Sequence, residues 1–233
     1  MAVVAAPALP SSSTCDGTAA RVIVFAARRT GSSFLVNLLR THPDVLMHGE
    51  LFHVRDIHDA SDGYHGHELP HEDVFEVRRR SPLGMLHHVQ CHTEGRRAVG
   101  LKVFRDHLSP RNWQKLWSWC TVCVVLRRED VRAQYGSLLR ARATGRWKGR
   151  TDRRLLANVS FDAVGYQGWW RNQQHWYSAV SDGLARRGSN VTVVPLSFER
   201  NLVGEGGPDL TPLWRALRLT PPRGSSARRR NSG

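Results

Sequence analysis

The residues in this sequence that most clearly suggest chemistry are arginines placed beside small hydroxyl side chains. The stretch "FAARRTGSSFLVNLL" (25–39) sets such residues between an apolar run and an amphipathic pattern. A strand, a Gly/Ser/Thr turn and a helix in succession aim several backbone N–H groups and the positive end of the helix dipole at one point. The glycine permits close backbone approach, and the hydroxyls offer donors. The predicted anion-binding residues are Arg28, Arg29, Thr30, Gly31, Ser32 and Ser33.

A second group of basic and hydroxyl residues follows another apolar run, in "VVLRREDVRAQYGSLL" (124–139). Arg127 and Arg128 stand at the carboxyl end of a predicted strand, where ligands of open α/β sheets bind. Arginine offers a planar fork to a phosphate, and the Ser137 hydroxyl completes the site if the turn folds back over it. Two anion sites at strand ends predict a nucleotide that carries two distant phosphates.

Two other interpretations of the first turn have to be weighed. The simplest is an ordinary strand-to-helix turn with two solvated arginines, because a single short anion motif often occurs by chance. The other is a Walker loop, GxxxxGK[ST], which would require glycine at 26 and lysine at 32. The sequence has Ala26 and Ser32 instead, which disfavours an ordinary P-loop kinase or NTPase.

The elements that must position these residues alternate between strand and helix patterns. Continuous apolar runs predict strands buried on both faces, and the alternation with helices predicts an α/β fold with a central parallel sheet flanked by helices. Residues 48–80 are charged, rich in histidine and weakly periodic, which predicts a long excursion. The predicted strands are 21–26, 98–104, 121–126 and 191–196. The predicted helices are 32–40, one from Pro82, one from Pro110, 129–143, one from Tyr166 to Leu184 closed by Gly188, and one from Thr211.

The length of 233 residues fits one domain, predicted at 21–220, with tails at 1–20 and 221–233. The formal net charge of +14 predicts an anionic partner, which charge alone does not identify among nucleic acid, an acidic membrane surface, a phosphorylated cofactor and a polyanionic substrate. No apolar run reaches the roughly 20 residues needed to span a bilayer.

The cysteines predict no disulfide framework, because the four of them are too few and too unevenly spaced. Cys120 and Cys123 form a CxxC, but "CTVCVVL" resembles a buried strand, in which residues three apart point to opposite faces. Core cysteines are therefore expected rather than a metal or redox pair. Sequons at Asn158 and Asn190 matter only in a secretory compartment, so the location stays open between cytoplasm and secretory pathway.

The first arginine motif resembles that of sulfotransferases that use 3′-phosphoadenosine 5′-phosphosulfate, especially the nodulation-factor and trehalose-sulfotransferase-like branch. In that family an R-x-G-[ST]-[ST] turn after the first strand grips the 5′-phosphosulfate; residues 29–33 match it and Phe34 follows. The branch continues with a His-Pro break and a Gly-Glu pair, found here at 42–43 and 49–50. Arg28 stands where the family usually has proline, which leaves open whether Arg28 or Arg29 contacts the nucleotide.

The second arginine motif resembles the family signature LRR-x-D-x-x-A-Q-x-x-S-L, which binds the 3′-phosphate and is matched over 126–138. A TG-x-W extension follows at 144–147, and Phe198-Glu199 matches a Tyr-Glu-like pair. The resemblance spans roughly 21–203 in order. It implies a P-loop-containing nucleotide-hydrolase-like sulfotransferase fold and transfer of a sulfuryl group to a hydroxyl, on a carbohydrate or glycolipid acceptor.

The resemblance also implies a mechanism. Sulfuryl transfer is similar to phosphoryl transfer, in which positioning and charge stabilisation dominate, so Arg29 and the turn amides would stabilise the leaving phosphate. A base must take the acceptor proton, and the branch places Glu50 in that role. His107 is the second choice, and His48 and His53 are further rivals. Lys102 either faces the cofactor or extends its amine to solvent from a strand end.

Two further classes of function remain to be considered. The histidines at 48, 53, 58, 65, 67 and 71 lack zinc-site spacing, so no metal is expected. A basic nucleic-acid-binding protein would fit the sequence pI of about 11, but the basic residues are scattered rather than gathered in a known reader motif. A nucleotide-dependent kinase is the other alternative, disfavoured by Ser32.

Overall fold

The structure is a computed structural model, and it describes residues 18–53, 81–93, 95–147 and 160–222. Within these residues strands and helices alternate along the chain. The strands are β1 (Ala20–Ala26), β2 (Val45–Met47), β3 (Ala98–Val103), β4 (Val122–Arg127) and β5 (Thr192–Ser197). The helices are α1 (Ser32–Arg40), α3 (Pro82–Cys91), α4 (Pro110–Trp119), α5 (Val131–Thr144), α6 (Ala163–Ala185) and α7 (Thr211–Leu217). Short helical turns are η1 (Arg105–His107), η3 (Gly188–Asn190) and η4 (Phe198–Leu202).

The described strands form one five-stranded, all-parallel sheet in the order β2-β3-β1-β4-β5. Val24 of β1 lies opposite Lys102 of β3 and opposite Val124 of β4. The carboxyl ends of these three strands therefore finish at the same edge of the sheet, which is where open α/β sheets bind ligands. The predicted α/β fold with a parallel sheet flanked by helices is confirmed.

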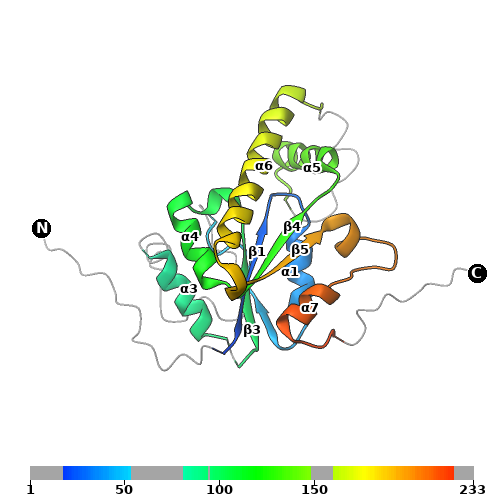
Figure 1. Cartoon of the computed structure of the whole chain (residues 1–233). Helices are drawn as coiled ribbons and strands as arrows, with labels where there is room; N and C mark the ends of the chain where they lie inside the picture. The colour runs from blue at the N-terminus through cyan, green and yellow to red at the C-terminus, as the bar shows by residue number, and fades with distance from the viewer. Residues whose placement is uncertain (1–17, 54–80, 94, 148–159, 223–233) are drawn as a thin grey trace, which may run out of the picture.

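Helices cover both faces of the sheet (Figure 1). On one face, Ile23 and Phe25 of β1 belong to a core that includes residues of α3, α4 and α6. On the other face, Val22 and Val24 belong to a core that includes residues of α1 and α7. Since successive strand residues point to opposite faces, a strand covered on both sides must be apolar throughout. This explains why the central strands are mostly apolar in sequence, whereas the edge strand β5 is partly exposed.

Local signals in the sequence fix several helix starts. The Ser81 hydroxyl accepts a hydrogen bond from the Gly84 N–H at the start of α3, over 3.1 Å. The Asp130 carboxylate accepts one from the Ala133 N–H at the start of α5, over 2.8 Å. Both side chains satisfy an amide that has no partner inside its helix. Proline occupies the first turn of α3, α4 and α7, where its missing N–H leaves no bond unmade.

Three local predictions are wrong in detail. The strand β2 was not predicted, because three residues are too short for an alternating pattern to be distinguishable. Helix α6 ends at Ala185, before the Gly188 predicted to close it. The strand predicted at 98–104 ends one residue earlier, at Val103, and a short helical turn that ends at His107 follows it.

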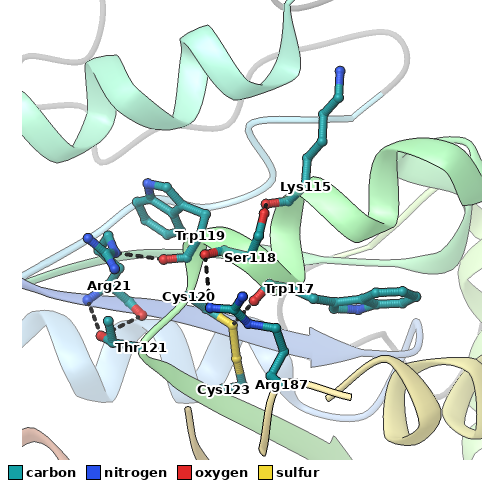
Figure 2. The surroundings of a disulfide bond; sticks show 9 residues. All are labelled: Arg21, Lys115, Trp117, Ser118, Trp119, Cys120, Thr121, Cys123 and Arg187. Carbon is teal, nitrogen blue, oxygen red and sulfur yellow. Dashed lines mark hydrogen bonds between the residues drawn. A yellow bond between two sulfur atoms is a disulfide. The ribbon is translucent and has the colours of Figure 1, made fainter. Parts of the chain in front are cut away.

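The prediction of unpaired core cysteines is also wrong, because Cys120 and Cys123 form a disulfide (Figure 2). The strand argument failed because Cys120 precedes β4 and follows α4 directly, so strand geometry does not separate the two side chains. Their Cα atoms are 6.1 Å apart, within the range that a disulfide spans. Cys91 is disulfide-bonded as well, and no cysteine in the described segments is free. The inference against structural disulfides does not hold.

Helix α6 holds the carboxyl ends of β1 and β4 in place. The indole N–H of Trp176 donates to the Ala26 carbonyl over 3.0 Å. The Tyr177 hydroxyl donates to the Leu126 carbonyl over 2.7 Å and accepts from the Ala27 N–H over 3.1 Å. Burial raises the pKa of Tyr177, so its hydroxyl keeps the proton that it donates. The turn that follows β1 therefore leaves the sheet from a fixed position.

Parts of the predicted organisation lie outside the described residues. These parts are most of the two predicted tails and residues 54–80 of the predicted excursion, which include four of the six clustered histidines. The division into a domain at 21–220 and two tails stays a prediction. In the segments that the structure covers, no helix has both the length and the apolar character needed to cross a membrane.

Candidate functional site

The turn between β1 and α1 has a backbone suited to anion binding. Arg29 has φ 67° and Gly31 has φ 83°, so two left-handed residues flank Thr30. Alternation of this kind directs successive N–H groups toward one concave side. Gly31 is also the N-cap of the nine-residue helix α1, and within the described chain no side chain caps that helix. The first amides of α1 are therefore available to an anion.

Gly31 is required at this position for two independent reasons. Its positive φ is unfavourable for any residue with a Cβ. A Cβ added at Gly31 would also come within 2.6 Å of two ring carbons of Phe198. Phe198 begins η4, directly after β5, so the turn is packed against the segment that carries Glu199.

Substitution of Gly31 by alanine should destabilise the protein strongly. The left-handed backbone costs about 1–2 kcal/mol for a residue with a Cβ, and overpacking against Phe198 adds about 1–3 kcal/mol. Chemical denaturation of G31A and wild type would measure the difference in free energy of unfolding. G168A is the matched control, because a Cβ at Gly168 in α6 meets nothing within 4 Å. Equal stability of G31A and wild type would contradict the turn geometry.

The two predicted anion motifs meet at Arg29. Its Nε donates to the Ser137 hydroxyl of α5 over 2.9 Å, across a sequence separation of 108 residues. Its Nη1 donates to the carbonyl of Trp147. Arg128 donates from Nη1 to the Arg29 carbonyl over 3.4 Å, and the Gln134 amide donates to the Arg28 carbonyl over 2.8 Å. The loop after β4 and helix α5 thus hold the first turn directly.

Several guanidinium groups crowd this junction. Burial lowers the pKa of Arg29, and the charges of Arg128 and Arg140 lower it further. Arginine nevertheless stays protonated in proteins, so the junction keeps its positive charge. Glu199 offsets part of that charge: its carboxylate is 3.5 Å from Arg128 and accepts from the Glu129 N–H over 2.8 Å. The positive charges of the guanidinium groups repel one another and Glu199 offsets only part of that repulsion. A bound anion would therefore stabilise this junction.

Arg127 is separated from this junction. Its guanidinium carbon lies 4.6 Å from the ring centroid of Tyr177, on the face of the sheet that α6 covers. There it lines a groove of about 570 Å³ beside the edge strand β5, with Glu129, Ser181 and Arg200 among the other lining residues. Of the two predicted arginines, the structure therefore brings only Arg128 to the turn.

The other residues predicted for the turn have different positions. Arg28 points toward the end of β3, where its Nη2 is 2.7 Å from an Asp106 carboxylate oxygen. The Thr30 hydroxyl is fully buried and donates to the Ala27 carbonyl over 2.8 Å, which uses its proton within the turn. Ser32 is buried, whereas Ser33 and Phe34 are exposed. Among the three hydroxyls, Ser33 is the one that faces the site.

Glu50 and His107, the two candidate bases, lie together beside the turn. Lys102 of β3 bridges them to it: its ammonium is 2.9 Å from Glu50 Oε1 and donates to the Ser33 hydroxyl over 2.7 Å. The other carboxylate oxygen, Glu50 Oε2, lies 3.4 Å from His107 Nε2. Lys102 is buried, so the idea that it extends to solvent is wrong. A carboxylate, an ammonium and an imidazole therefore form one cluster at the edge of the sheet.

The protonation of His107 follows from its contacts. His107 Nδ1 is 3.3 Å from the Phe104 N–H, which can only donate, so Nδ1 accepts and carries no proton. Burial lowers the pKa of His107 although the neighbouring Glu50 carboxylate raises it, so the ring is neutral near pH 7. In this tautomer Nε2 carries the proton and lies 3.4 Å from Glu50 Oε2, without the alignment that a hydrogen bond requires. His107 can support the Glu50 carboxylate from this position, but it has no free lone pair with which to accept a proton.

The pKa of Glu50 lies well below the ordinary range for glutamate. Burial raises it, but the neighbouring His107 imidazole and the ammonium of Lys102 together outweigh burial and lower it. A carboxyl whose folded pKa is lowered stabilises the protein above its ordinary pKa, and that stability is lost as the pH falls through the folded value. Glu50 is therefore ionised at neutral pH.

This lowered pKa predicts a pH-dependent stability. The advantage of wild type over E50Q in free energy of unfolding should be largest at pH 6–7 and shrink by an amount on the order of 1–3 kcal/mol between pH 5 and pH 2. Denaturant titrations of both proteins across that range would measure it, with E205Q as the control because Glu205 is exposed. An advantage that does not change with pH would contradict the contacts of Glu50.

The sequence interpretation missed or undervalued several residues of the site. Asp106 was not assigned a role, and nothing in its local sequence signals one. Gln134 and Trp147 lie within the matched stretches 126–138 and 144–147, but no role of their own was assigned to them. Lys102 had a usable signal, because a lysine within the apolar run "AVGLKVF" of a strand buried on both faces requires a partner. Among the described residues, no group of three His, Cys, Asp or Glu side chains is placed to hold a metal ion.

Comparison with known proteins does not identify the chain. No protein-family model matches it, and no curated protein matches it.

Proposed function

We propose that this protein is a sulfotransferase that moves a sulfuryl group from 3′-phosphoadenosine 5′-phosphosulfate to a hydroxyl of a carbohydrate or glycolipid acceptor. The observation that carries the proposal is the contact between Arg29 and Ser137, which brings two arginine motifs 108 residues apart in sequence to one place. The α/β fold would then be of the P-loop-containing nucleotide-hydrolase-like kind.

Support for a nucleotide with two anionic ends comes from the two parts of the junction. Arg29, the uncapped amides of α1 and the Ser33 hydroxyl suit the 5′-phosphosulfate. Arg128 and Ser137 suit the 3′-phosphate, because guanidinium groups bind phosphate oxygens through paired hydrogen bonds. In this assignment Arg29 is the arginine that contacts the nucleotide, while Arg28 is held by Asp106 at the end of β3.

Support for group transfer comes from the cluster around Glu50. In-line sulfuryl transfer requires a group that accepts the acceptor's proton while the new bond forms. Glu50 is an ionised, half-buried carboxylate. A single side chain, that of Lys102, connects it to the turn, because Lys102 contacts both Glu50 and Ser33. His107 Nε2 lies 3.4 Å from Glu50 Oε2, and this proximity supports a role for His107 as a positioning residue for the base.

A ligand-stabilisation experiment tests this proposal. The full chain is heated alone and with 3′-phosphoadenosine 5′-phosphate, ATP, AMP or single-stranded RNA, and the melting temperature is recorded. We expect the bisphosphate nucleotide to stabilise the protein most, by about 2.7 kcal/mol at a hundredfold excess over its Kd. A screen of hydroxyl-bearing acceptors with labelled phosphosulfate donor would then detect transfer.

Each alternative outcome points elsewhere. A preference for ATP would favour a kinase. Stabilisation by RNA that falls steeply with salt, without preference for the bisphosphate nucleotide, would favour a nucleic-acid-binding protein. Either result would overturn the proposal.

A further inference from the structure

Lys102 differs from the other basic residues of the described segments in its burial. Of the lysines and arginines in the described segments, it alone is classed with the buried residues, at 5% exposure. An ammonium is costly to bury and is rarely found buried without partners. Its partners here are Glu50 Oε1 and Ser33 Oγ, so it joins the candidate base to the turn. Neither the strand nor the core needs a cation at this point.

The position of Lys102 in the sheet explains how it reaches both groups. Lys102 pairs with Val24 in the neighbouring strand β1, two residues before that strand ends. Ala98 precedes Lys102 by four residues and lies in the core that includes α1, so Lys102 points to that same face. Its side chain therefore runs beside the start of α1 and presents the ammonium to the Ser33 hydroxyl. The turn has serine at 32 and no lysine of its own, and the neighbouring strand supplies the cation.

We propose that Lys102 is a catalytic residue of the sulfuryl transfer: its ammonium contacts an oxygen of the transferring sulfuryl group and moves away from Glu50 as it does so. This inference rests on the proposed function. Three N–H donors on a flexible stem allow Lys102 to exchange a carboxylate oxygen for a sulfuryl oxygen without leaving Ser33. Arrival of the donor at the turn would thus be coupled to release of the base.

The chemical step is balanced with these groups alone. The bond between sulfur and the phosphate oxygen breaks, and its electron pair stays on that oxygen of the nucleotide. A new bond forms between sulfur and the acceptor oxygen, whose proton passes to Glu50. Lys102 neutralises charge on the sulfuryl oxygens in a partly desolvated site, where a fixed cation is worth more than in water. Once Lys102 has turned to the sulfuryl group, Glu50 loses an opposing charge and becomes the stronger base.

The test compares binding of a nucleotide that lacks the sulfuryl group with turnover. We expect K102M to bind 3′-phosphoadenosine 5′-phosphate nearly as well as wild type, and to lose about 10²–10³-fold in kcat, as when one donor to a transition-state charge is removed. In the pH profile of its residual activity, the acid limb should lie at a higher pH than in wild type, because the pKa of Glu50 rises when the ammonium is removed. K115M is the matched control, since Lys115 is a partly exposed lysine on α4.

A second variant keeps the proposal falsifiable if K102M does not fold. K102R retains the charge, but a planar guanidinium does not reproduce the point contact with both Ser33 and Glu50, so kcat should still fall while nucleotide binding persists. Wild-type kcat in K102M or in K102R, or equal loss of nucleotide binding and turnover, would overturn the role of Lys102. Wild type that binds no bisphosphate nucleotide would instead overturn the proposed function itself, and the role of Lys102 with it.

Discussion

Replacement of Glu50 by glutamine should lower the kcat of sulfuryl transfer by about 10²–10⁴-fold, the contribution of a positioned general base. Glutamine has nearly the same shape, and its carbonyl oxygen can still accept from Lys102. It cannot take a proton from the acceptor hydroxyl. Affinity for 3′-phosphoadenosine 5′-phosphate should therefore be nearly unchanged, which titration of E50Q and wild type would measure beside single-turnover transfer.

The control for this experiment is E205Q, which changes an exposed glutamate in the loop between η4 and α7. The pH profile of kcat/KM adds a second criterion. If Glu50 is the base, the acid limb of wild type should lie below the ordinary glutamate pKa of about 4.3. If His107 is the base, the limb should lie at or below about 6.5, and E50Q should remain active. That combination would contradict the assignment of Glu50.

Replacement of Arg29 by alanine should weaken binding of the bisphosphate nucleotide by about 10–100-fold, because hydrogen bonds to charged groups contribute about 1.5–3 kcal/mol. The variant also removes the contacts of Arg29 with Ser137 and with the Trp147 carbonyl, so α5 would lose a connection to the turn. R29K should recover only part of the affinity, because an ammonium cannot supply a planar fork. Isothermal titration with the nucleotide would measure both variants.

R186A is the matched control for Arg29. Arg186 is an exposed arginine at the end of α6. The chain then enters the start of β5, at the end of the sheet opposite to the carboxyl ends of the strands. R186A should bind the nucleotide as wild type does. R28A provides the sharper contrast, since Arg28 is paired with Asp106 rather than with α5. If R28A loses nucleotide binding and R29A keeps it, the assignment of Arg29 is wrong.

Much of the fold was predictable because its signals are local. The central strands are mostly apolar in sequence, and Ser81 and Asp130 mark helix starts by capping an amide within their own first turn. The bounds 32–40 of α1 were predicted to the residue, since the glycine before it and the His-Pro after it act on neighbouring residues. The predictions that failed concern segments with a short or ambiguous sequence pattern. Strand β2 has too few residues to show a period, and Cys120 lies between a helix and a strand.

The candidate site was predictable as a set of anion-binding residues, but its internal arrangement was not. The type and spacing of Arg29, Gly31 and Ser137 already indicate phosphate-like ligands at strand ends. Whether Arg28 or Arg29 would meet Ser137, and whether Arg127 or Arg128 would reach the turn, depends on side-chain directions. In the structure Arg29 and Arg128 are the two that reach the junction.

The sequence alone therefore determined which elements form and which residues carry charge or hydroxyl groups at their ends. Only the tertiary structure decided that Lys102, Glu50 and His107 form one cluster with Ser33. The reason is physical: strand and helix signals act over a few residues, whereas these contacts depend on the order and register of β1 and β3. A shift of one residue in that register would turn Lys102 to the other face of the sheet.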